Sequence, residues 1–213
     1  MRLIAPLLVL AALALAGCGA GPRVTQTRHV APYDRIEVDS SIDVEFAPGD
    51  ADTVSVSAGE HVIDHIETAS SDGVLHISIR DHGIVIGPDP YDDTRVQVSR
   101  TALQAIRVQG SSDLSLGRID APALAIEING SGSVDATGTV GALTATIQGS
   151  GDADLGRLVA RTATVAIQGS GNAKVNVKDR LDISVQGSGD VAYRGNPRVS
   201  QNVQGSGDVH AED

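Results

Sequence analysis

Aromatic side chains and cysteine are nearly absent from this chain of 213 residues. There is no tryptophan, and one phenylalanine with three tyrosines makes up all the aromatic residues. Large rings normally dominate the interior of a domain, so the core here must be built from valine, isoleucine, leucine and alanine. Such a core favours thin, regular layers over a thick globule. The single cysteine, Cys18, excludes a disulfide within the chain.

Positive charge is also in short supply. Lysine and arginine number 16 against 27 aspartates and glutamates, which gives a net charge of −11. Nucleic-acid binding needs clustered lysine and arginine to neutralise phosphates, so a nucleic-acid partner is not expected. The same imbalance argues against electrostatic attachment of the chain to anionic lipid.

The first residues have the pattern of a secretory signal. Arg2 precedes an apolar run from Leu3 to Leu15, and small residues follow before Cys18. The run is shorter than the roughly 20 residues that span a bilayer. The sequence Leu-Ala-Gly-Cys at 15–18 resembles the bacterial lipobox. That resemblance implies a signal peptide over residues 1–17 and a lipid-modified, palmitate-bearing Cys18. Gly19 then favours the outer membrane.

A six-fold internal repeat is the strongest signal in the sequence. Its consensus is an aliphatic residue followed by Gln-Gly-Ser-Gly-Asp, and the copies begin at 108, 128, 147, 167, 185 and 203. Aliphatic residues alternate with polar ones on both sides of each copy, which is typical of strands with one buried face. Glycine permits a sharp turn at the same place in every copy.

These copies predict a parallel β-solenoid with coils of about 19 residues. One such coil cannot bury its own apolar face, but stacked coils can, with each strand pairing to its counterpart about 4.8 Å along the axis. We expect Ile147 and Ile167 to be neighbours one coil apart. We also expect an amide ladder along the Gln/Asn column, formed by Gln109, Asn129, Gln148, Gln168, Gln186 and Gln204. An antiparallel sandwich is the alternative, but its hairpins do not require the same turn at the same phase.

The N-terminal half follows the same plan less regularly. Alternating segments predict strands at 33–38, 42–46, 53–56 and 75–79, and Ser40-Ser41-Ile42-Asp43 is interpreted as a degenerate first turn. Residues 63–66 hint at a helical turn, and 87–93 has the composition of a loop. Residues 18–30 are interpreted as a linker from the lipidated cysteine, and 31–213 as one head domain.

The order of these elements resembles the head GIN domain family of bacterial envelope proteins, whose members are described as auto-transporter adhesins. The matching features are Tyr33-Asp34-Arg35-Ile36-Glu37-Val38, the strand at 75–79 after Asp72-Gly73, and the series of Gly-Ser-Gly turns. The resemblance implies a right-handed β-helix and carries no catalytic motif.

The sequence offers two candidate metal sites, and we expect neither to bind a metal. Calcium-binding β-rolls need a carboxylate in every turn, whereas Ser133 and Asn172 interrupt the aspartate column of Asp113, Asp152, Asp190 and Asp208. Neighbouring carboxylates about 4.8 Å apart repel each other. His61 and His65 flank Asp64, but no third ligand is evident in the sequence. We therefore expect no metal and no cofactor.

The sequence is compatible with three functions. The first is a non-catalytic, lipid-anchored head that binds a protein or glycan at the cell envelope, with the membrane as a partner through Cys18. The second is an envelope-maintenance lipoprotein with an envelope partner. The third is a polysaccharide-acting β-helix enzyme, which is disfavoured because no set of nucleophile, base and orienting residue is visible and aromatic platforms are lacking. We expect no enzymatic activity.

Overall fold

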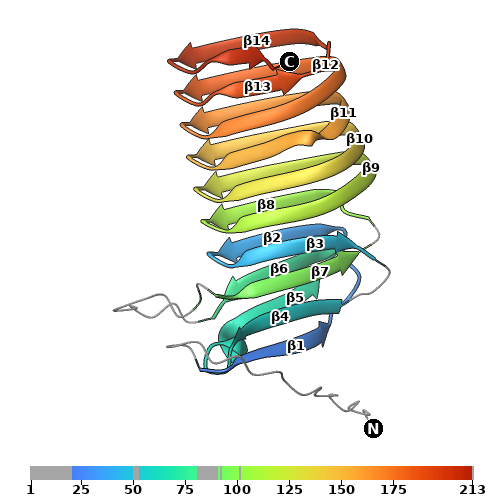
Figure 1. Cartoon of the computed structure of the whole chain (residues 1–213), viewed down its shortest axis with the longest axis vertical. Helices are drawn as coiled ribbons and strands as arrows, with labels where there is room; N and C mark the ends of the chain where they lie inside the picture. Colours follow the sequence, from blue (N-terminus) through green and yellow to red (C-terminus); the bar gives the residue numbers. More distant parts are fainter. Residues whose placement is uncertain (1–20, 50–52, 81–90, 92, 101, 213) are drawn as a thin grey trace.

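The computed structural model describes residues 21–49, 53–80, 91, 93–100 and 102–212. These residues form a β-solenoid, a stack of flattened coils with the N-terminal strands at one end and the C-terminal strands at the other (Figure 1). The predicted all-β solenoid fold is confirmed, with coils of about 20 residues. The sandwich alternative is wrong, because equivalent segments of successive repeats pair in parallel.

The repeat region consists of long strands that turn from one wall of the solenoid to the other. They are β8 (Ala105–Gly110), β9 (Asp113–Gly130), β10 (Ser133–Gly149), β11 (Asp152–Gly169), β12 (Asn172–Gly187), β13 (Val191–Arg194), β14 (Arg198–Gly205) and β15 (Val209–Ala211). In each coil one wall precedes the glycine turn and the other follows it. We call the outer surface of the first wall the glutamine face and that of the second wall the aspartate face, after the side chains that recur there from coil to coil.

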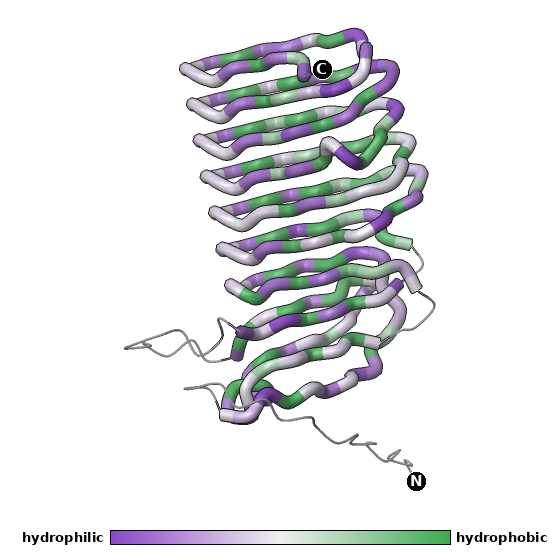
Figure 2. Tube along the Cα trace, viewed as in Figure 1, coloured by the Kyte–Doolittle hydropathy of each residue, from purple (hydrophilic) through white to green (hydrophobic). Residues whose placement is uncertain are grey.

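The coils stack in register, as the repeat predicts. Ile147 lies opposite Ile128 on one side and Ile167 on the other, and all three are buried. The leading glycines of the last five turns pair in one column, Gly130, Gly149, Gly169, Gly187 and Gly205. In Figure 2 hydrophobic and hydrophilic residues alternate along each wall, because successive side chains of a strand point to opposite sides. The inward set fills one continuous core, which is aliphatic apart from Tyr33 and Phe46.

Coil length varies only at the return corner, where the chain leaves the aspartate face for the glutamine face. The register shifts there, so that Leu155 pairs with Val175 but Val159 already pairs with Asn176. The glycine turns themselves keep their phase. The 18-residue coils are therefore shortened at the corner and leave the packed walls unchanged.

The N-terminal half contains β1 (Arg23–His29), β2 (Arg35–Ser40), β3 (Asp43–Pro48), β4 (Thr53–Gly59), β5 (Ile66–Ser71), β6 (Val74–Ile79) and β7 (Arg95–Arg100). Strands β2 and β3 form the first coil, in which Ser40 pairs with Gly110, so the degenerate turn at 40–43 is confirmed. The helical turn is a 3-10 helix over Ile63–His65. The loop predicted at 87–93 lies mostly outside the described residues.

Two expectations need correction in this half. The linker predicted over 18–30 is wrong from residue 23 onward, because Arg23–His29 form β1 and pair antiparallel with β4 along their whole length. The parallel pattern also does not extend through the whole chain, since β4 pairs antiparallel with β7, and β5 with β6. Antiparallel strands at this end close the stack without requiring a further coil.

Candidate binding surfaces

The aspartate face carries a column of side chains that bond from coil to coil. The carboxylate of Asp152 accepts hydrogen bonds from the backbone N–H and side-chain amide of Asn172, both at 2.9 Å. The side-chain oxygen of Asn172 accepts a hydrogen bond from the backbone N–H of Asp190 at 3.1 Å. The carboxylate of Asp190 accepts one from the backbone N–H of Asp208 at 2.8 Å. Asp113 accepts in the same way from Ser133. The column therefore satisfies backbone donors at the turns.

This bonding gives the interrupted aspartate column a structural use. Asparagine can replace aspartate in it because both offer an oxygen acceptor. Among the described residues, no group of three or more histidine, cysteine or acidic side chains is placed to hold a metal ion. Absence of calcium binding stays a prediction, which a thermal midpoint unchanged by a chelator would support.

The glutamine face does not form the expected amide ladder. Gln109 donates to Glu37 at 2.8 Å, and Asn129 donates to Glu127 at 3.0 Å. Ionised carboxylates are stronger acceptors than neighbouring amides, so these two amides turn to them. Gln148, Gln168, Gln186 and Gln204 have no bonding partner within the described part of the chain. These four side chains are exposed, and water can satisfy them.

The glutamine face carries charge in its N-terminal coils and again in its last coils, where Arg180, Asp182 and Arg198 lie. Glu127 lies 2.8 Å from Arg107 and also accepts from Asn129, and these hydrogen bonds hold the pKa of Glu127 below its usual value. His76 lies 3.4 Å from Glu37 one coil away. The two coils β10 and β11 present only threonine, alanine and glutamine at the corresponding outward positions, so the face becomes neutral there.

The sequence-predicted histidine pair is placed at the N-terminal end. His61 and His65 are exposed; His61 precedes the 3-10 helix and His65 is its last residue, and Asp64 between them accepts a hydrogen bond from Gln26 at 3.3 Å. The solenoid therefore uses Asp64 to connect this turn to β1. Cys18, the predicted lipidation site, lies outside the described residues.

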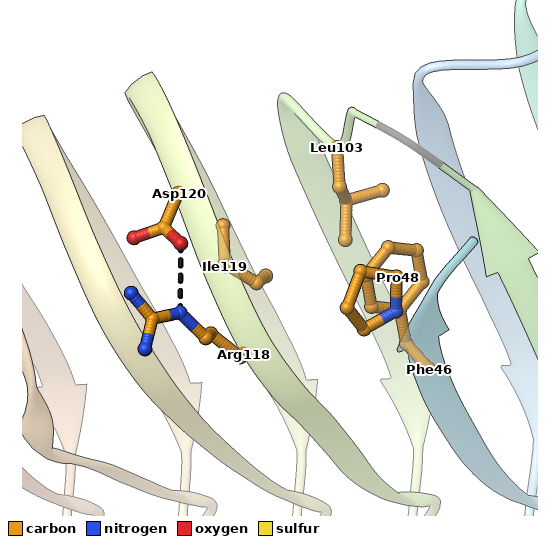
Figure 3. Close-up of a pocket in the computed structure, with 6 residues that line it drawn as sticks. All are labelled: Phe46, Pro48, Leu103, Arg118, Ile119 and Asp120. Atoms are coloured by element: carbon orange, nitrogen blue, oxygen red, sulfur yellow. Dashed lines mark hydrogen bonds and ion pairs between the residues drawn. The ribbon is translucent and has the colours of Figure 1, made fainter. Parts of the chain in front are cut away.

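A small pocket lies where the N-terminal half meets the repeat coils. It measures about 150 Å³ and is lined by Phe46, Pro48, Leu103 and Ile119, with the Arg118–Asp120 pair at its edge. In Figure 3 the Arg118 guanidinium points toward Asp120 and away from the apolar residues. Its Nε donates a hydrogen bond to Oδ2 of Asp120 at 2.8 Å. Small-molecule sites usually hold roughly 300–1,000 Å³, so this hollow is too small for an ordinary ligand.

A larger, open trough lies at the return corners of the last coils. It measures about 580 Å³ and is lined by three basic side chains (Lys178, Arg180 and Arg198), two acidic ones (Asp179 and Asp182) and three neutral residues. Arg180 is paired with Asp182 at 2.7 Å, and this hydrogen bond raises the pKa of Arg180 and lowers that of Asp182. Lys178 and Arg198 have no such partner among the described residues. The trough therefore carries net positive charge on an acidic protein.

Sequence reasoning did not find this trough. Its basic side chains come from two coils and are brought together by stacking, since Arg180 pairs with Arg198 in register. The available signal was the concentration of lysine and arginine in the return segments, namely Arg157, Arg161, Lys178, Arg180, Arg194 and Arg198.

Comparison with known proteins settles the family. The family model described as "putative auto-transporter adhesin, head GIN domain" matches residues 32–197, which is most of the chain. The chain belongs to this family. The resemblance stated from the sequence is thereby confirmed. No curated protein matches the chain.

Solved structures share the fold at low sequence identity. A protein from Bacteroides fragilis, described as a putative adhesin, is 19% identical with a TM-score of 0.72 over 89% of this chain and 97% of its own. A putative adhesin from Parabacteroides distasonis is 22% identical, with a TM-score of 0.60 over 91% and 98%. Another protein of that species, described as a putative lipid binding protein, is 20% identical, with a TM-score of 0.50 over 90% and 97%.

Proposed function

We propose that this head GIN protein is a non-catalytic binding module of the cell envelope, anchored by a lipid on Cys18. The family description and the adhesin-like relatives support a binding role. The lipobox-like sequence before Cys18 supports the anchor and, with Gly19, the outer membrane. No helix among the described residues is long and apolar enough to cross a membrane.

The observation that carries the proposal is the basic trough. Lys178 and Arg198 project there without ion-pair partners among the described residues, on a chain whose net charge is −11. A ligand that carries anionic groups, such as an acidic glycan or an acidic protein segment, fits this charge. Steering by such a patch acts over about a Debye length, roughly 8 Å at physiological salt, so binding is expected to weaken as salt is raised.

Crosslinking in intact cells followed by pull-down tests the binding role. The double variant Lys178→Gln with Arg198→Gln is expected to lose the captured partner, because it removes two of the three basic side chains of the trough without touching the core. Lys174→Gln is the matched control, since this exposed lysine lies on the aspartate face. Capture by the double variant equal to that of the control would show that the trough is not the site.

The identity of the partner separates the two binding interpretations that the sequence leaves open. A host or matrix molecule supports adhesion, whereas a component of the same cell envelope supports envelope maintenance. Either outcome retains a binding head. Turnover of a polysaccharide by the purified protein would instead support the enzyme alternative.

Metabolic labelling with a fatty acid tests the anchor. Cys18→Ser is expected to remove the label entirely and to release the protein from the membrane fraction, because Cys18 is the sole thiol in the sequence. Ser41→Ala, a change at an exposed turn position, is the control and should leave both readouts unchanged. Equal labelling of the Cys18→Ser variant and the parent would contradict lipidation at this residue.

A further inference from the structure

The residues that the structure describes begin at Gly21, three positions after Cys18. The carbonyl of Pro22 accepts a hydrogen bond from the N–H of Glu60 at 3.0 Å, and the Arg23 guanidinium bonds to the Asp93 carbonyl. Gly21 lies against His61, since a Cβ on Gly21 would come within 3.2 Å of the imidazole ring. Residues 21–23 are therefore already part of the head.

Strand β1 then fixes this start firmly to the rest of the solenoid. Its seven residues pair with β4 from Arg23–Gly59 to His29–Thr53. Arg28 adds hydrogen bonds to the carbonyls of Ile66 at 2.5 Å and Ile63 at 3.0 Å. Burial lowers the pKa of this guanidinium, and its bonds to carbonyls replace the lost water. Detachment of β1 from the head would break these contacts. The tether between Cys18 and the head is therefore not lengthened by release of β1.

The distance available to the tether follows from chain geometry alone. Three peptide units separate the Cα atoms of Cys18 and Gly21, and they span at most about 11 Å whatever their conformation. We infer that the lipid-anchored protein meets the membrane with its N-terminal end, where the turn at 59–63 and the 3-10 helix face the lipid headgroups. This inference rests on the proposed lipidation of Cys18.

Charge favours an end-on arrangement over a side-on one. The aspartate face presents four carboxylates in its column, Asp113, Asp152, Asp190 and Asp208, and an anionic bilayer surface repels them. The N-terminal end carries both signs of charge, since Arg23 and Arg28 lie among Glu60, Asp64 and Asp93, and it is therefore less acidic than the aspartate face. The solenoid is therefore expected to project from the membrane along its axis.

The stack then holds its distal coils well away from the lipid. The hydrogen-bonded path from β1 to β15 contains ten strands, and nine spacings of about 4.8 Å amount to roughly 43 Å. Figure 1 shows β1 and β14 at opposite ends of this stack. The basic trough lies between β12 and β14, so this geometry presents it at the end away from the membrane.

Energy transfer from a single tryptophan tests the arrangement, because the chain contains none of its own. Glu60→Trp places the donor in the proximal turn, and Ser206→Trp, also at an exposed position, places it in the last glycine turn. Both variants are purified in lipidated form and bound to phosphatidylethanolamine/phosphatidylglycerol vesicles that contain dansyl-labelled headgroups. Transfer is expected to be several-fold greater for Glu60→Trp. Equal transfer from the two positions would overturn the end-on arrangement.

A lengthened tether provides the second measurement. Twenty glycine and serine residues inserted after Ala20 behave as a coil of roughly 25 Å, so transfer from the Glu60→Trp variant should fall by at least half. Unchanged transfer would show that the tether does not position the head and would overturn the inference. Absence of fatty-acid label on the parent would instead overturn the proposed anchor, so the two failures are distinguishable.

Discussion

The glycine that opens each turn is required for a geometric reason. Gly169 has a φ of +132°, and a Cβ there would lie 2.2 Å from the carbonyl oxygen of Gly149 in the preceding coil. That carbonyl is already engaged, since it accepts from the N–H of Ser170 at 2.8 Å. A side chain at this position must therefore push apart two coils that are joined by a hydrogen bond.

Gly169→Ala is accordingly expected to lower the free energy of unfolding by about 3 kcal/mol or more, since the strained backbone alone costs about 1–3 kcal/mol. Gly156 is the matched control, because a Cβ there meets no atom closer than 3.6 Å. Gly156→Ala should change stability by no more than about 0.5 kcal/mol. Urea denaturation measures both, and equal effects would contradict the proposed role of the glycine column.

Ile167 and Gln168 are adjacent residues that point to opposite sides of the same wall. Ile167 is fully buried between Ile147 and Val185, whereas Gln168 is exposed. Ile167→Ala is expected to cost roughly 2–5 kcal/mol, as for other buried aliphatic truncations. Gln168→Ala should be close to neutral, because its amide has no partner within the described chain. Chemical denaturation of the two variants checks the inward assignment, which a larger effect at Gln168 would refute.

At the scale of one coil, the aspartate column stabilises stacking through hydrogen bonds. Asp152→Ala removes the acceptor of two bonds from Asn172 and is expected to lower stability by about 1–3 kcal/mol. Asp152→Asn should recover most of this loss, because an amide oxygen can accept the same backbone N–H. Asp154→Ala is the control, since its carboxylate receives only a long bond of 3.4 Å. Thermal unfolding compares the three, and an Asn variant as unstable as the Ala variant would argue against the hydrogen-bond explanation.

Elements whose order depends on buried side chains could be predicted from the sequence. Alternating aliphatic residues and a glycine at a fixed phase predict the repeat coils. In the structure, both the aliphatic residues and the glycines pair in register from coil to coil. Strand β1 could not be predicted, because Val24 is its sole aliphatic residue and β4 holds it by backbone hydrogen bonds. The partner of a polar edge strand leaves no trace in its own side-chain pattern.

The same limit applies to the side-chain columns. The repeat predicts that Gln168 stacks on Gln148 and Asn172 on Asp152, and the structure has both pairs in register. The sequence does not predict which column forms hydrogen bonds between coils, because both columns contain hydrogen-bonding side chains. The position of each column relative to the glycine turn decides which one bonds. The aspartate column lies beside backbone N–H groups at the turn, whereas the glutamine column faces carboxylates or solvent.

For the whole molecule, charge is distributed by coil geometry as well as by composition. Acidic side chains follow the glycine turns along the aspartate face, while many arginines lie in the return corners. The net charge predicts an acidic surface, and the basic trough at Lys178 and Arg198 departs from it. Such a site can be recognised only when the stacking register is known. The candidate site was therefore less predictable than the fold.

Stacking in register also predicts that a complete coil can be removed from the whole molecule. Gly149 and Gly169 occupy equivalent positions in neighbouring coils, so deletion of residues 150–169 joins Gly149 directly to Ser170 with the same turn geometry. The flanking coils then meet through the same kinds of side chain, since Ser133, Asp152 and Asn172 share one column. In a repeat protein stability is close to a sum of coil and interface contributions.

The coil deletion is therefore expected to fold cooperatively, with a thermal midpoint lowered by several degrees and an unchanged β-type circular dichroism spectrum. Deletion of residues 150–159 is the matched control, because it removes one wall of a coil and shifts every later inward side chain out of its column. This shorter deletion should lose cooperative unfolding. If the two deletions behaved alike, the coil could not be the unit of the fold. Cooperative unfolding of the 150–169 deletion alone would identify the coil as the unit of the fold. The distance between the membrane-proximal end and the distal trough could then be changed one coil, or about 4.8 Å, at a time.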